Sequence, residues 1–392
     1  MKHKLLRVAV VGIGNMGSAH AMCIANGKVA GMKLTAVCDV DTAKLDRIQL
    51  ELPGVRTYTD WQELVKQPEI DAVIIAVPHC LHSRIAVEAM KSGKHVLIEK
   101  PADIRVSAVK KAVETAKQTG KVFAIMFNQR TNPLFVRARE IVKSGLLGEL
   151  KRSVWIITNW YRSQRYYDSG GWRGTWNGEG GGVLLNQSPH NLDIWQWICG
   201  MPCEITAFCD EGKYHNIEVE DDVTIFVRYS NGATGTFITS TGEYPGTNRL
   251  EISGTLGKLV LENGVLKWWK LEQSEREICK ESTQSFPRIN TTYTEERQEF
   301  EGTAHAGILQ NFCNAILYNE PLLSPGEDGL NELSISNAAY LSAWTDNSPV
   351  ALPLDDVVFD ERLDAKQATS IYNNQSDSQF HTDYISRWKV QW

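Results

Sequence analysis

The sequence lacks several features that would place the chain in a specialised class of protein. It has no run of about eighteen apolar residues, the length that a membrane-spanning helix needs. Hydrophobic residues make up 42% and charged residues 22%, as in ordinary globular proteins. The basic start, Met1–Arg7, leads into Val8–Val11 and glycine without the apolar segment of an export signal. We therefore expect a water-soluble, cytoplasmic protein that does not bind membranes.

The sequence also lacks a basic surface and a cluster of metal ligands. Lys and Arg number 41 against 47 Asp and Glu, a net charge of -6, so nucleic acid is not an expected partner. The eight cysteines are scattered without a CxxC pair, and we expect reduced thiols. The acidic run Glu218–Asp222 opens a predicted strand, where consecutive carboxylates point to opposite faces, so no metal site is predicted.

The first part of the chain alternates short apolar runs with segments of helical spacing. This rhythm predicts a parallel α/β sheet. Gly93 and Gly120 follow the helical segments at 85–92 and 108–119, where a helix is expected to stop. The predicted strands are 7–11, 34–38, 72–77, 95–98 and 122–127.

After Asn132 the pattern changes to a helix at 133–144 followed by β-rich runs. Asn231-Gly232 and Asn263-Gly264 are strong hairpin signals, and consecutive hairpins predict a largely antiparallel sheet. Helices at about 305–318 and 329–344 complete an α+β domain. The predicted strands are 153–159, 222–229, 233–239, 249–254 and 258–262. We assign residues 1–129 to a cofactor domain, 130–361 to a substrate-binding and oligomerisation domain, and 362–392 to a polar C-terminal arm.

The first strand runs directly into a glycine-rich turn and then a helical segment, the context that a dinucleotide-binding fingerprint requires. Gly12 permits the tight turn, Gly14 lets a pyrophosphate approach the backbone, and Gly17 lets the helix pack on the strand. The helix N-terminus adds amide donors and positive potential. The predicted cofactor-binding residues of this turn are Gly12, Ile13, Gly14, Asn15, Met16 and Gly17.

Asp39 ends the second predicted strand, downstream of the glycine turn. A carboxylate at this position accepts hydrogen bonds from the adenosine ribose and repels a 2'-phosphate. Neither Val40 nor Asp41 is the arginine that would pair with such a phosphate. The sequence therefore favours NAD over NADP as cofactor.

Three further segments carry a resemblance to a known family. They are Ala76–His82 after the third of the predicted strands, Glu99-Lys100-Pro101 after the fourth, and Gly180-Gly181-Gly182 continuing through Asn186, His190 and Asp193. In this order and spacing they resemble the glucose-fructose oxidoreductase / inositol dehydrogenase / MocA (Gfo/Idh/MocA) family over nearly the whole chain. The resemblance implies a Rossmann domain and a second domain with a large, open, mostly antiparallel sheet. It also implies action on sugars or cyclitols and assembly as a homodimer or homotetramer.

The resemblance assigns catalysis to two residues. Lys100 is expected to reach both the substrate hydroxyl and the cofactor, and His190 to accept the proton as the hydride leaves. Oxidising a secondary alcohol requires such a base and a positive charge beside the developing alkoxide. Beyond the glycine turn and Asp39, the expected cofactor-binding residues are Pro78, His79, His82, Glu99, Lys100 and Asn128.

The sequence departs from the family pattern at two positions. Asn186 stands where the family often has Asp; it can orient an imidazole but cannot supply a counter-charge. His79 stands where an asparagine is usual after the proline.

Half of the twelve tryptophans lie between Trp155 and Trp197, interleaved with tyrosine, arginine and glutamine. Aromatic faces with polar side chains suit pyranose rings, although core packing explains about half of these aromatics. The run 160–176 with 186–190 is similar to a subgroup that oxidises the C3 hydroxyl of glycosides to 3-keto sugars. An interdomain ion pair explains Arg130 as well as substrate binding does. The predicted substrate-binding residues are Lys100, Arg130, Trp160, Tyr161, Arg162, Arg173, Trp176, Asn186 and His190.

The sequence therefore predicts an NAD-dependent oxidoreductase that acts on a sugar, a glycoside or a cyclitol. Three alternatives stay open: an inositol dehydrogenase, an aldehyde or imine reductase on the same scaffold, and a non-catalytic sensor of NAD and sugar. Retention of both Lys100 and His190 argues against the sensor.

Overall fold

The computed structural model describes residues 5–298 and 302–371, which form two compact units. The first contains residues 5–131 and 303–333. The second contains residues 132–298, 302 and 334–371.

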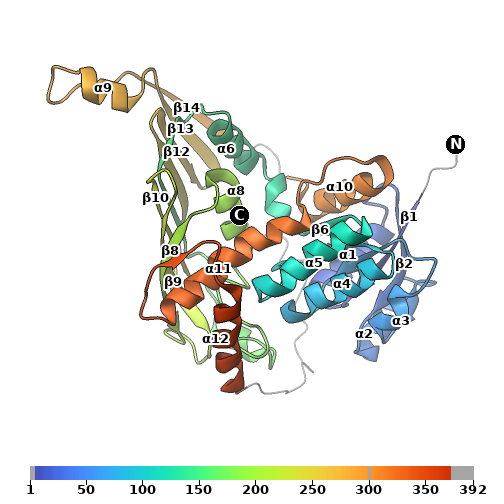
Figure 1. The fold of residues 1–392 in the computed structure, drawn as a ribbon. Coiled ribbons are helices and arrows are strands. Elements are labelled where there is room, and N and C mark those ends of the chain that lie inside the picture. Colours follow the sequence, from blue (N-terminus) through green and yellow to red (C-terminus); the bar gives the residue numbers. More distant parts are fainter. Residues whose placement is uncertain (1–4, 299–301, 372–392) are drawn as a thin grey trace. The chain divides into compact units, whose positions relative to one another are not determined.

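Six parallel strands form the sheet of the first unit, in the order β3-β2-β1-β4-β5-β6. Figure 1 labels β1, β2 and β6 of this sheet, with its helices α1 to α5. The predicted parallel α/β arrangement is thus confirmed. The sheet includes one strand that was not predicted, the three-residue β3, which is too short for a periodic signal. The strands are β1 (Leu6–Val11), β2 (Met32–Cys38), β3 (Arg56–Tyr58), β4 (Ala72–Ile75), β5 (His95–Ile98) and β6 (Phe123–Ile125). The connecting helices are α1 (Asn15–Ala25), α2 (Thr42–Glu51), α3 (Trp61–Val65), α4 (His82–Lys91) and α5 (Val106–Thr119), with short 3-10 turns η1 (His79–Leu81) and η2 (Asn128–Thr131).

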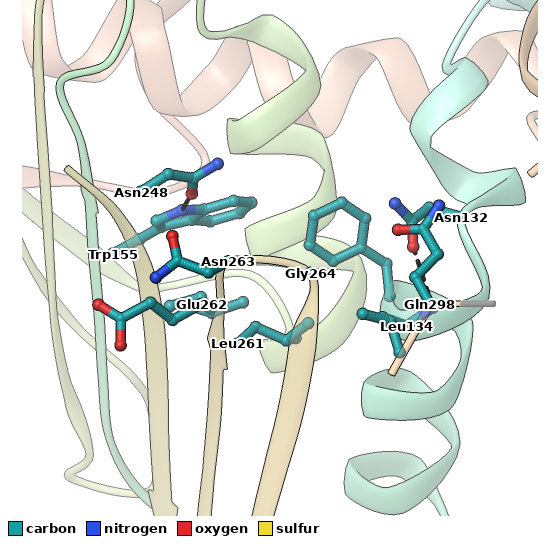
Figure 2. A pocket seen from close by; sticks show the side chains of 11 residues that line it. Asn132, Leu134, Trp155, Asn248, Leu261, Glu262, Asn263, Gly264 and Gln298 are labelled. Atoms are coloured by element: carbon teal, nitrogen blue, oxygen red, sulfur yellow. Dashed lines mark hydrogen bonds between the residues drawn. The ribbon is translucent and has the colours of Figure 1, made fainter. Parts of the chain in front are cut away.

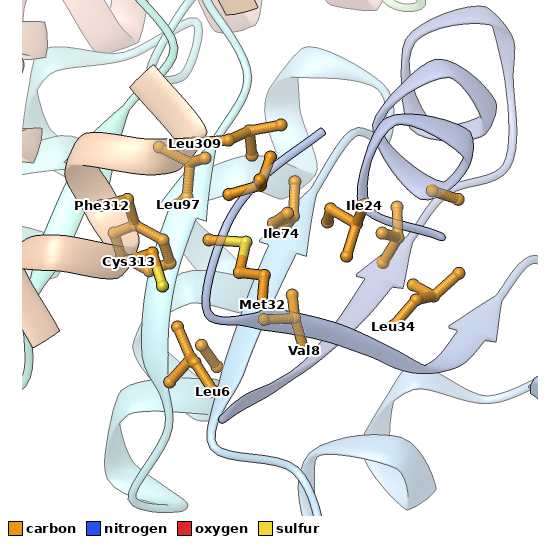
Figure 3. Close-up of a cluster of buried hydrophobic side chains, with 14 of the residues drawn as sticks. Leu6, Val8, Ile24, Met32, Leu34, Ile74, Leu97, Leu309, Phe312 and Cys313 are labelled. Carbon is orange, nitrogen blue, oxygen red and sulfur yellow. The ribbon is translucent and has the colours of Figure 1, made fainter. Parts of the chain in front are cut away.

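Helix α10 (Ala304–Tyr318) completes the core of the first unit, although most of the second unit's sequence separates it from β6. Its Leu309, Phe312 and Cys313 pack with strand residues such as Leu6 and Leu97 (Figure 3). The domain prediction differs here, because it placed all of 130–361 in the second domain. Residues 303–333, including η3 (Gly326–Asp328), belong with the first unit because the apolar face of α10 is buried there.

A nine-stranded sheet forms the second unit, in the order β14-β13-β12-β11-β7-β10-β9-β8-β15. Every neighbouring pair is antiparallel except β7 with β10, which confirms the mostly antiparallel sheet. The strands are β7 (Leu150–Ile157), β8 (Glu204–Glu211), β9 (Glu220–Arg228), β10 (Thr234–Ser240), β11 (Asn248–Gly254), β12 (Gly257–Glu262), β13 (Val265–Leu271), β14 (Thr291–Arg297) and β15 (Val350–Ala351). The helices are α6 (Pro133–Lys143), α7 (Gln164–Asp168), α8 (Pro189–Cys199), α9 (Glu275–Glu281), α11 (Gly329–Ala343), whose first turn lies in the first unit, and α12 (Asp356–Ala368).

Both predicted hairpins are present in this sheet. Asn263 and Gly264, at φ 51° and 69°, join β12 to β13, and Asn231-Gly232 joins β9 to β10. Helices α6 and α8 pack on one face of the sheet through aromatic side chains. Trp195 of α8 lies 5.5 Å, centroid to centroid, from Phe237 and donates its indole N–H to the Ser153 hydroxyl at 3.0 Å. This packing positions the N-terminus of α8, where His190 lies.

The predicted C-terminal arm begins as regular structure. Residues 362–368 are the second half of α12, with Leu363 buried, so the arm prediction is wrong for this stretch. The helix was not predicted because only Phe359 and Leu363 of α12 are buried and the rest of its sequence is largely polar. The aromatic residues predicted to pin the arm, from Tyr372 to Trp392, lie outside the described residues. None of the helices in the described ranges combines the length and the apolarity needed to cross a membrane.

Candidate functional site

The glycine turn after β1 has the geometry that a dinucleotide requires. Gly12 lies at φ +90°, and a Cβ there would lie 2.3 Å from the Ala76 carbonyl oxygen. A Cβ on Gly17 would lie 1.7 Å from the Gly12 carbonyl oxygen, so only glycine lets α1 approach the turn. At Gly14, by contrast, no heavy atom lies within 4 Å of the Cβ position. The turn therefore presents open backbone at the N-terminus of α1, the position at which dinucleotide-binding folds hold a pyrophosphate.

Asp39 follows β2 and faces this turn. One carboxylate oxygen accepts the Ile13 N–H at 2.7 Å, and the other accepts the Asp41 N–H at 2.9 Å. Each oxygen keeps a second lone pair for a ribose hydroxyl. The residues of the turn and Asp39 thus fit the adenosine and pyrophosphate parts of NAD.

Glu99 orders the backbone at the proposed catalytic lysine. Its carboxylate lies 2.6 Å from His20 Nε2 and accepts the Lys100 N–H at 3.2 Å. Burial raises the pKa of Glu99, but the hydrogen bond and charge of His20, with the charges of His305 and Lys100, outweigh it and lower the pKa to about 2. A charged carboxylate therefore fixes the start of the Glu99-Lys100-Pro101 segment.

His82 links the loops that follow β4 and β5. Its ring is 1% exposed, with Nδ1 2.7 Å from the Pro101 carbonyl and Nε2 2.8 Å from the Val77 carbonyl. Burial lowers the pKa of His82 and favours the neutral ring, which can donate to one of the two carbonyls. The ring has no surface left for a cofactor, so we assign His82 to positioning these loops.

A triple-glycine segment leads toward α8 in the second unit. Buried Glu220 accepts the N–H groups of Gly182 at 2.8 Å and Leu184 at 2.9 Å, and the Tyr340 hydroxyl at 2.8 Å. A Cβ on Gly182 would lie 2.0 Å from the Glu220 carbonyl oxygen, and one on Gly181 would lie 2.3 Å from the Tyr340 hydroxyl. Burial raises the pKa of Glu220 to about 8 despite these three donors.

The turn from residue 174 to 188 carries Asn186 and leads to His190, the second residue of α8. The Asn186 amide donates to one oxygen of Glu179, and the other oxygen accepts the Gly174 N–H at 2.7 Å. Glu179 is 2% exposed. The turn has Asn186 in place of the family aspartate, but it contains a buried carboxylate, that of Glu179, which is hydrogen-bonded to Asn186.

Two parts of the chain match models of known protein families. Residues 6–127 match the model described as an oxidoreductase family with an NAD-binding Rossmann fold, and residues 135–260 match the GFO/IDH/MocA C-terminal domain. The chain belongs to the Gfo/Idh/MocA oxidoreductase family. The predictions of an NAD-binding Rossmann domain and of an oxidoreductase of this family are confirmed.

The similar proteins match two thirds or more of this Gfo/Idh/MocA chain. A myo-inositol 2-dehydrogenase from Thermotoga maritima is 25% identical over 86% of this chain and 96% of its own length. A scyllo-inositol 2-dehydrogenase (NAD(+)) from Bacillus subtilis is 28% identical over 67% of this chain and 75% of its own length. The crystal structure of the WlbA dehydrogenase from Chromobacterium violaceum, in complex with NADH and UDP-GlcNAcA, superposes with a TM-score of 0.78 at 26% identity, covering 91% of this chain and 98% of that one.

Several predicted site residues of this Gfo/Idh/MocA protein are buried and have protein neighbours. Arg130 is 3% exposed and pairs with Asp328 at 2.5 Å. Both residues belong to the first unit, so this ion pair lies within that unit and is not the interdomain pair weighed as the alternative to substrate binding. Trp176 is 3% exposed, with ring centroids 5.4 Å from Tyr340 and 5.3 Å from Trp344. Its indole therefore packs in an aromatic cluster with no face open to a sugar ring. Asn128 is buried, with its amide nitrogen 3.5 Å from His305 Nδ1, and Trp160 is also buried.

Other predicted residues keep exposed surface. Pro78 is exposed, and His79, Lys100, Arg162, Arg173 and Asn186 are half-buried. Tyr161 is half exposed, with its ring 5.7 Å from that of Tyr244.

Sequence reasoning missed His20, His305 and Glu179. His20 and His305 lie in α1 and α10, with ring centroids 5.8 Å apart, and burial lowers the pKa of His305 to about 4. The two histidines come from distant parts of the sequence, so no local pattern indicates that they meet. Glu179 directly precedes the triple glycine, and its place shortly before Asn186 was the available clue.

The acidic run that opens β9 holds no metal arrangement. Glu218 accepts the Trp176 N–H, Asp221 pairs with His215, and Asp222 pairs with Lys213. Across residues 5–298 and 302–371, no group of three His, Cys, Asp or Glu side chains could hold a metal ion. A small pocket beside Trp155 and Asn248 in the second unit contains none of the predicted site residues, and we assign it no role (Figure 2).

Proposed function

We propose that this chain catalyses the NAD-dependent oxidation of a secondary hydroxyl on a sugar, a glycoside or a cyclitol. The observation that carries the proposal is the glycine turn with Asp39, a dinucleotide site in a chain whose two parts both match this family. Similarity to two inositol dehydrogenases, and to a dehydrogenase crystallised with NADH and UDP-GlcNAcA, supports a polyhydroxylated ring as substrate.

Two residues carry the proposed chemistry. His190 accepts the proton of the substrate hydroxyl as the carbonyl forms, and the Lys100 ammonium stabilises the negative charge that develops on that oxygen. Bound NAD⁺ supplies the hydride acceptor. The ordered backbone at Lys100, held by Glu99, and the turn before His190, held by Glu179 and Glu220, support these roles.

A finer proposal concerns the carbon that is oxidised. Residues 160–176 with 186–190 resemble a subgroup that oxidises the C3 hydroxyl of glycosides, so we propose C3 of a glycoside as the position, giving a 3-keto sugar. Arg130 and Trp176 are left out of this substrate site because both are buried with protein partners.

The test is the appearance of reduced nicotinamide absorbance when myo-inositol, glucose or a methyl glucoside is added to the purified protein, with and without added NAD. We expect Lys100→Ala and His190→Ala each to lower kcat/KM by about 100-fold or more while both variants still bind NAD, and NAD affinity should stay within about twofold in His190→Ala. Lys33→Ala, an exposed lysine of β2, is the matched control and should leave turnover unchanged.

Near-wild-type turnover in either variant removes that residue from the mechanism. Turnover that is measurable only in the direction of carbonyl reduction favours the reductase alternative. Binding of NAD without turnover of any substrate favours the sensor.

A further inference from the structure

Two arginines of the second unit lie against one tyrosine ring. The guanidinium carbons of Arg162 and Arg173 are 5.2 and 4.6 Å from the Tyr166 ring centroid, so the two charged groups share one neighbour. Arg173 is also 4.4 Å from the centroid of the Trp172 ring, and Arg162 is 5.9 Å from that of Trp160. Both arginines are half-buried. Stacking on aromatic rings fixes the position of each charged group beside Tyr166.

Neither arginine has a carboxylate within 4.0 Å among the described residues. Within the same part of the chain, Arg162 donates to the carbonyl oxygens of Trp160 and Tyr161, and Arg173 to the Tyr166 hydroxyl. The carboxylates nearest in the sequence have other partners, since Asp168 accepts from Gln164 and Glu179 from Gly174 and Asn186.

This lack of a carboxylate is unusual in this chain, which has more acidic than basic residues. Most other arginines with described contacts pair with carboxylates, for example Arg7 with Asp71, Arg137 with Glu296 and Arg276 with Glu149.

The hydroxyl of Tyr166 connects the two arginines to the turn that leads to His190. It accepts an N–H from Arg173 at 2.8 Å and one from Gln187 at 3.2 Å. Both oxygen lone pairs are then used, which leaves its own proton for an acceptor on a ligand. Gln187 precedes His190 by three residues, so their Cα atoms are at most about 11 Å apart. The hydrogen bond from Gln187 therefore joins the Tyr166 hydroxyl to the segment that carries His190.

We propose that the substrate carries a negatively charged group, a carboxylate or a phosphate, which Arg162 and Arg173 bind. Each guanidinium has five N–H donors in a planar fork that matches these anions, and only one of its nitrogens is used within the described chain. A neutral polyol would satisfy donors but would leave two half-buried positive charges without a counter-charge. The Tyr166 hydroxyl donates to the same anion. This inference rests on the proposed function, because it names the class of sugar that is oxidised.

The experiment compares three substrates that share one ring, namely glucose, glucuronate and glucose 6-phosphate, in NAD reduction by the full chain. We expect kcat/KM to be about tenfold or more higher for one of the two anions than for glucose, and the preferred anion identifies carboxylate or phosphate. Arg162→Gln and Arg173→Gln should each remove this preference by lowering the kcat/KM for the preferred anion about tenfold more than that for glucose. Arg228→Gln, an exposed arginine of β9 that pairs with Glu204, is the matched control and should keep it.

The outcomes separate this inference from the proposed function. Glucose turned over as well as both anions, or variants that lower all three rates equally, would overturn the inference and leave the dehydrogenase standing. If no sugar is turned over, titration calorimetry with the two anions decides. Anion binding that is lost in Arg162→Gln and Arg173→Gln supports the inference without the reaction, and no binding of either anion overturns it.

Discussion

Two buried glutamates, one in each unit, order the backbone next to the proposed catalytic residues, yet their pKa values move in opposite directions. Burial raises the pKa of both carboxyls. At Glu99 the hydrogen bond with His20, together with the neighbouring charges of His20, His305 and Lys100, outweighs burial, and the pKa falls to about 2. At Glu220 the partners are two backbone N–H groups and the Tyr340 hydroxyl, and the pKa rises to about 8.

The difference shows that neutral donors can order a segment without offsetting the free-energy cost of burying a charged carboxylate. Glu99 acts in the first unit as a charged anchor for the Lys100 backbone. Glu220 acts in the second unit as a hydrogen-bonding anchor for Gly182 and Leu184, and it is mostly protonated at neutral pH. The two anchors should therefore respond differently to substitution and to pH.

The largest expected effect is a loss of stability, and it tests whether the triple glycine must pack closely against Glu220. Gly182→Ala places a methyl group 2.0 Å from the Glu220 carbonyl oxygen, where backbone cannot give way, and should destabilise the fold by about 3 kcal/mol or more. Gly14→Ala is the matched control in the first unit, since no heavy atom lies within 4 Å of its Cβ position. It should unfold like the wild type in urea but bind NAD at least about tenfold more weakly, because the methyl group meets the pyrophosphate. If Gly182→Ala were as stable as the wild type, the close approach of Gly182 to Glu220 would not be required for the fold.

Neutralising the charged anchor should have the next largest effect. Glu99→Gln removes the carboxylate that accepts from His20 and the Lys100 N–H. The pKa lowered from 4.5 to about 2 stabilises the folded state at pH 7 by an amount on the order of 1 to 3 kcal/mol, because His305, with its pKa of about 4, is neutral there and contributes no charge. Urea unfolding of Glu99→Gln should show a loss of that order. Glu220→Gln is the companion variant and should lose less at pH 7, since the folded state already holds Glu220 protonated. A larger loss in Glu220→Gln would reverse the comparison.

The pH dependence of stability sharpens the same contrast. The lowered pKa of Glu99 gives stability that is present above pH 4.5 and is lost as the pH falls toward about 2. The raised pKa of Glu220 works in the opposite sense. Its folded state holds a proton that the unfolded chain has released, so stability falls as the pH rises from 4.5 to about 8. Thermal unfolding between pH 5 and 8 should therefore show a decline that is shallower in Glu220→Gln and unchanged in Glu99→Gln. Identical slopes in all three proteins would show that Glu220 does not titrate in this range.

The contrast between the two units also shows what could be predicted from sequence. The cofactor half follows local rules: β1, the glycine turn and α1 occupy consecutive positions, and Asp39 directly follows β2. Each was predicted from its own stretch of sequence. The hairpins at Asn231-Gly232 and Asn263-Gly264 were predictable for the same reason, since turn chemistry is local.

What could not be predicted depends on contacts between distant segments. Nothing near Leu309 or Phe312 in the sequence shows that α10 packs in the core of the first unit. The burial of Trp176 depends on Tyr340 and Trp344, which belong to a much later part of the chain. Aromatic composition alone therefore could not separate a packed tryptophan from a sugar-binding one.

The smallest expected effect concerns Asn186, where the family often has aspartate. Asn186→Asp would restore the family residue, but it would place a second carboxylate against Glu179, which is buried and now accepts from the Asn186 amide. Two carboxylates in contact cannot both ionise, so we expect a loss of about 1 to 2 kcal/mol at pH 7, measured by urea unfolding, and a smaller loss at pH 5. The double variant Glu179→Gln with Asn186→Asp restores a donor and an acceptor with their positions exchanged, and it should recover most of the stability. Full stability of the single variant Asn186→Asp would show that Glu179 and Asn186 are not coupled. Recovery in the double variant would show that this chain keeps the family's negative charge before α8 but carries it on Glu179.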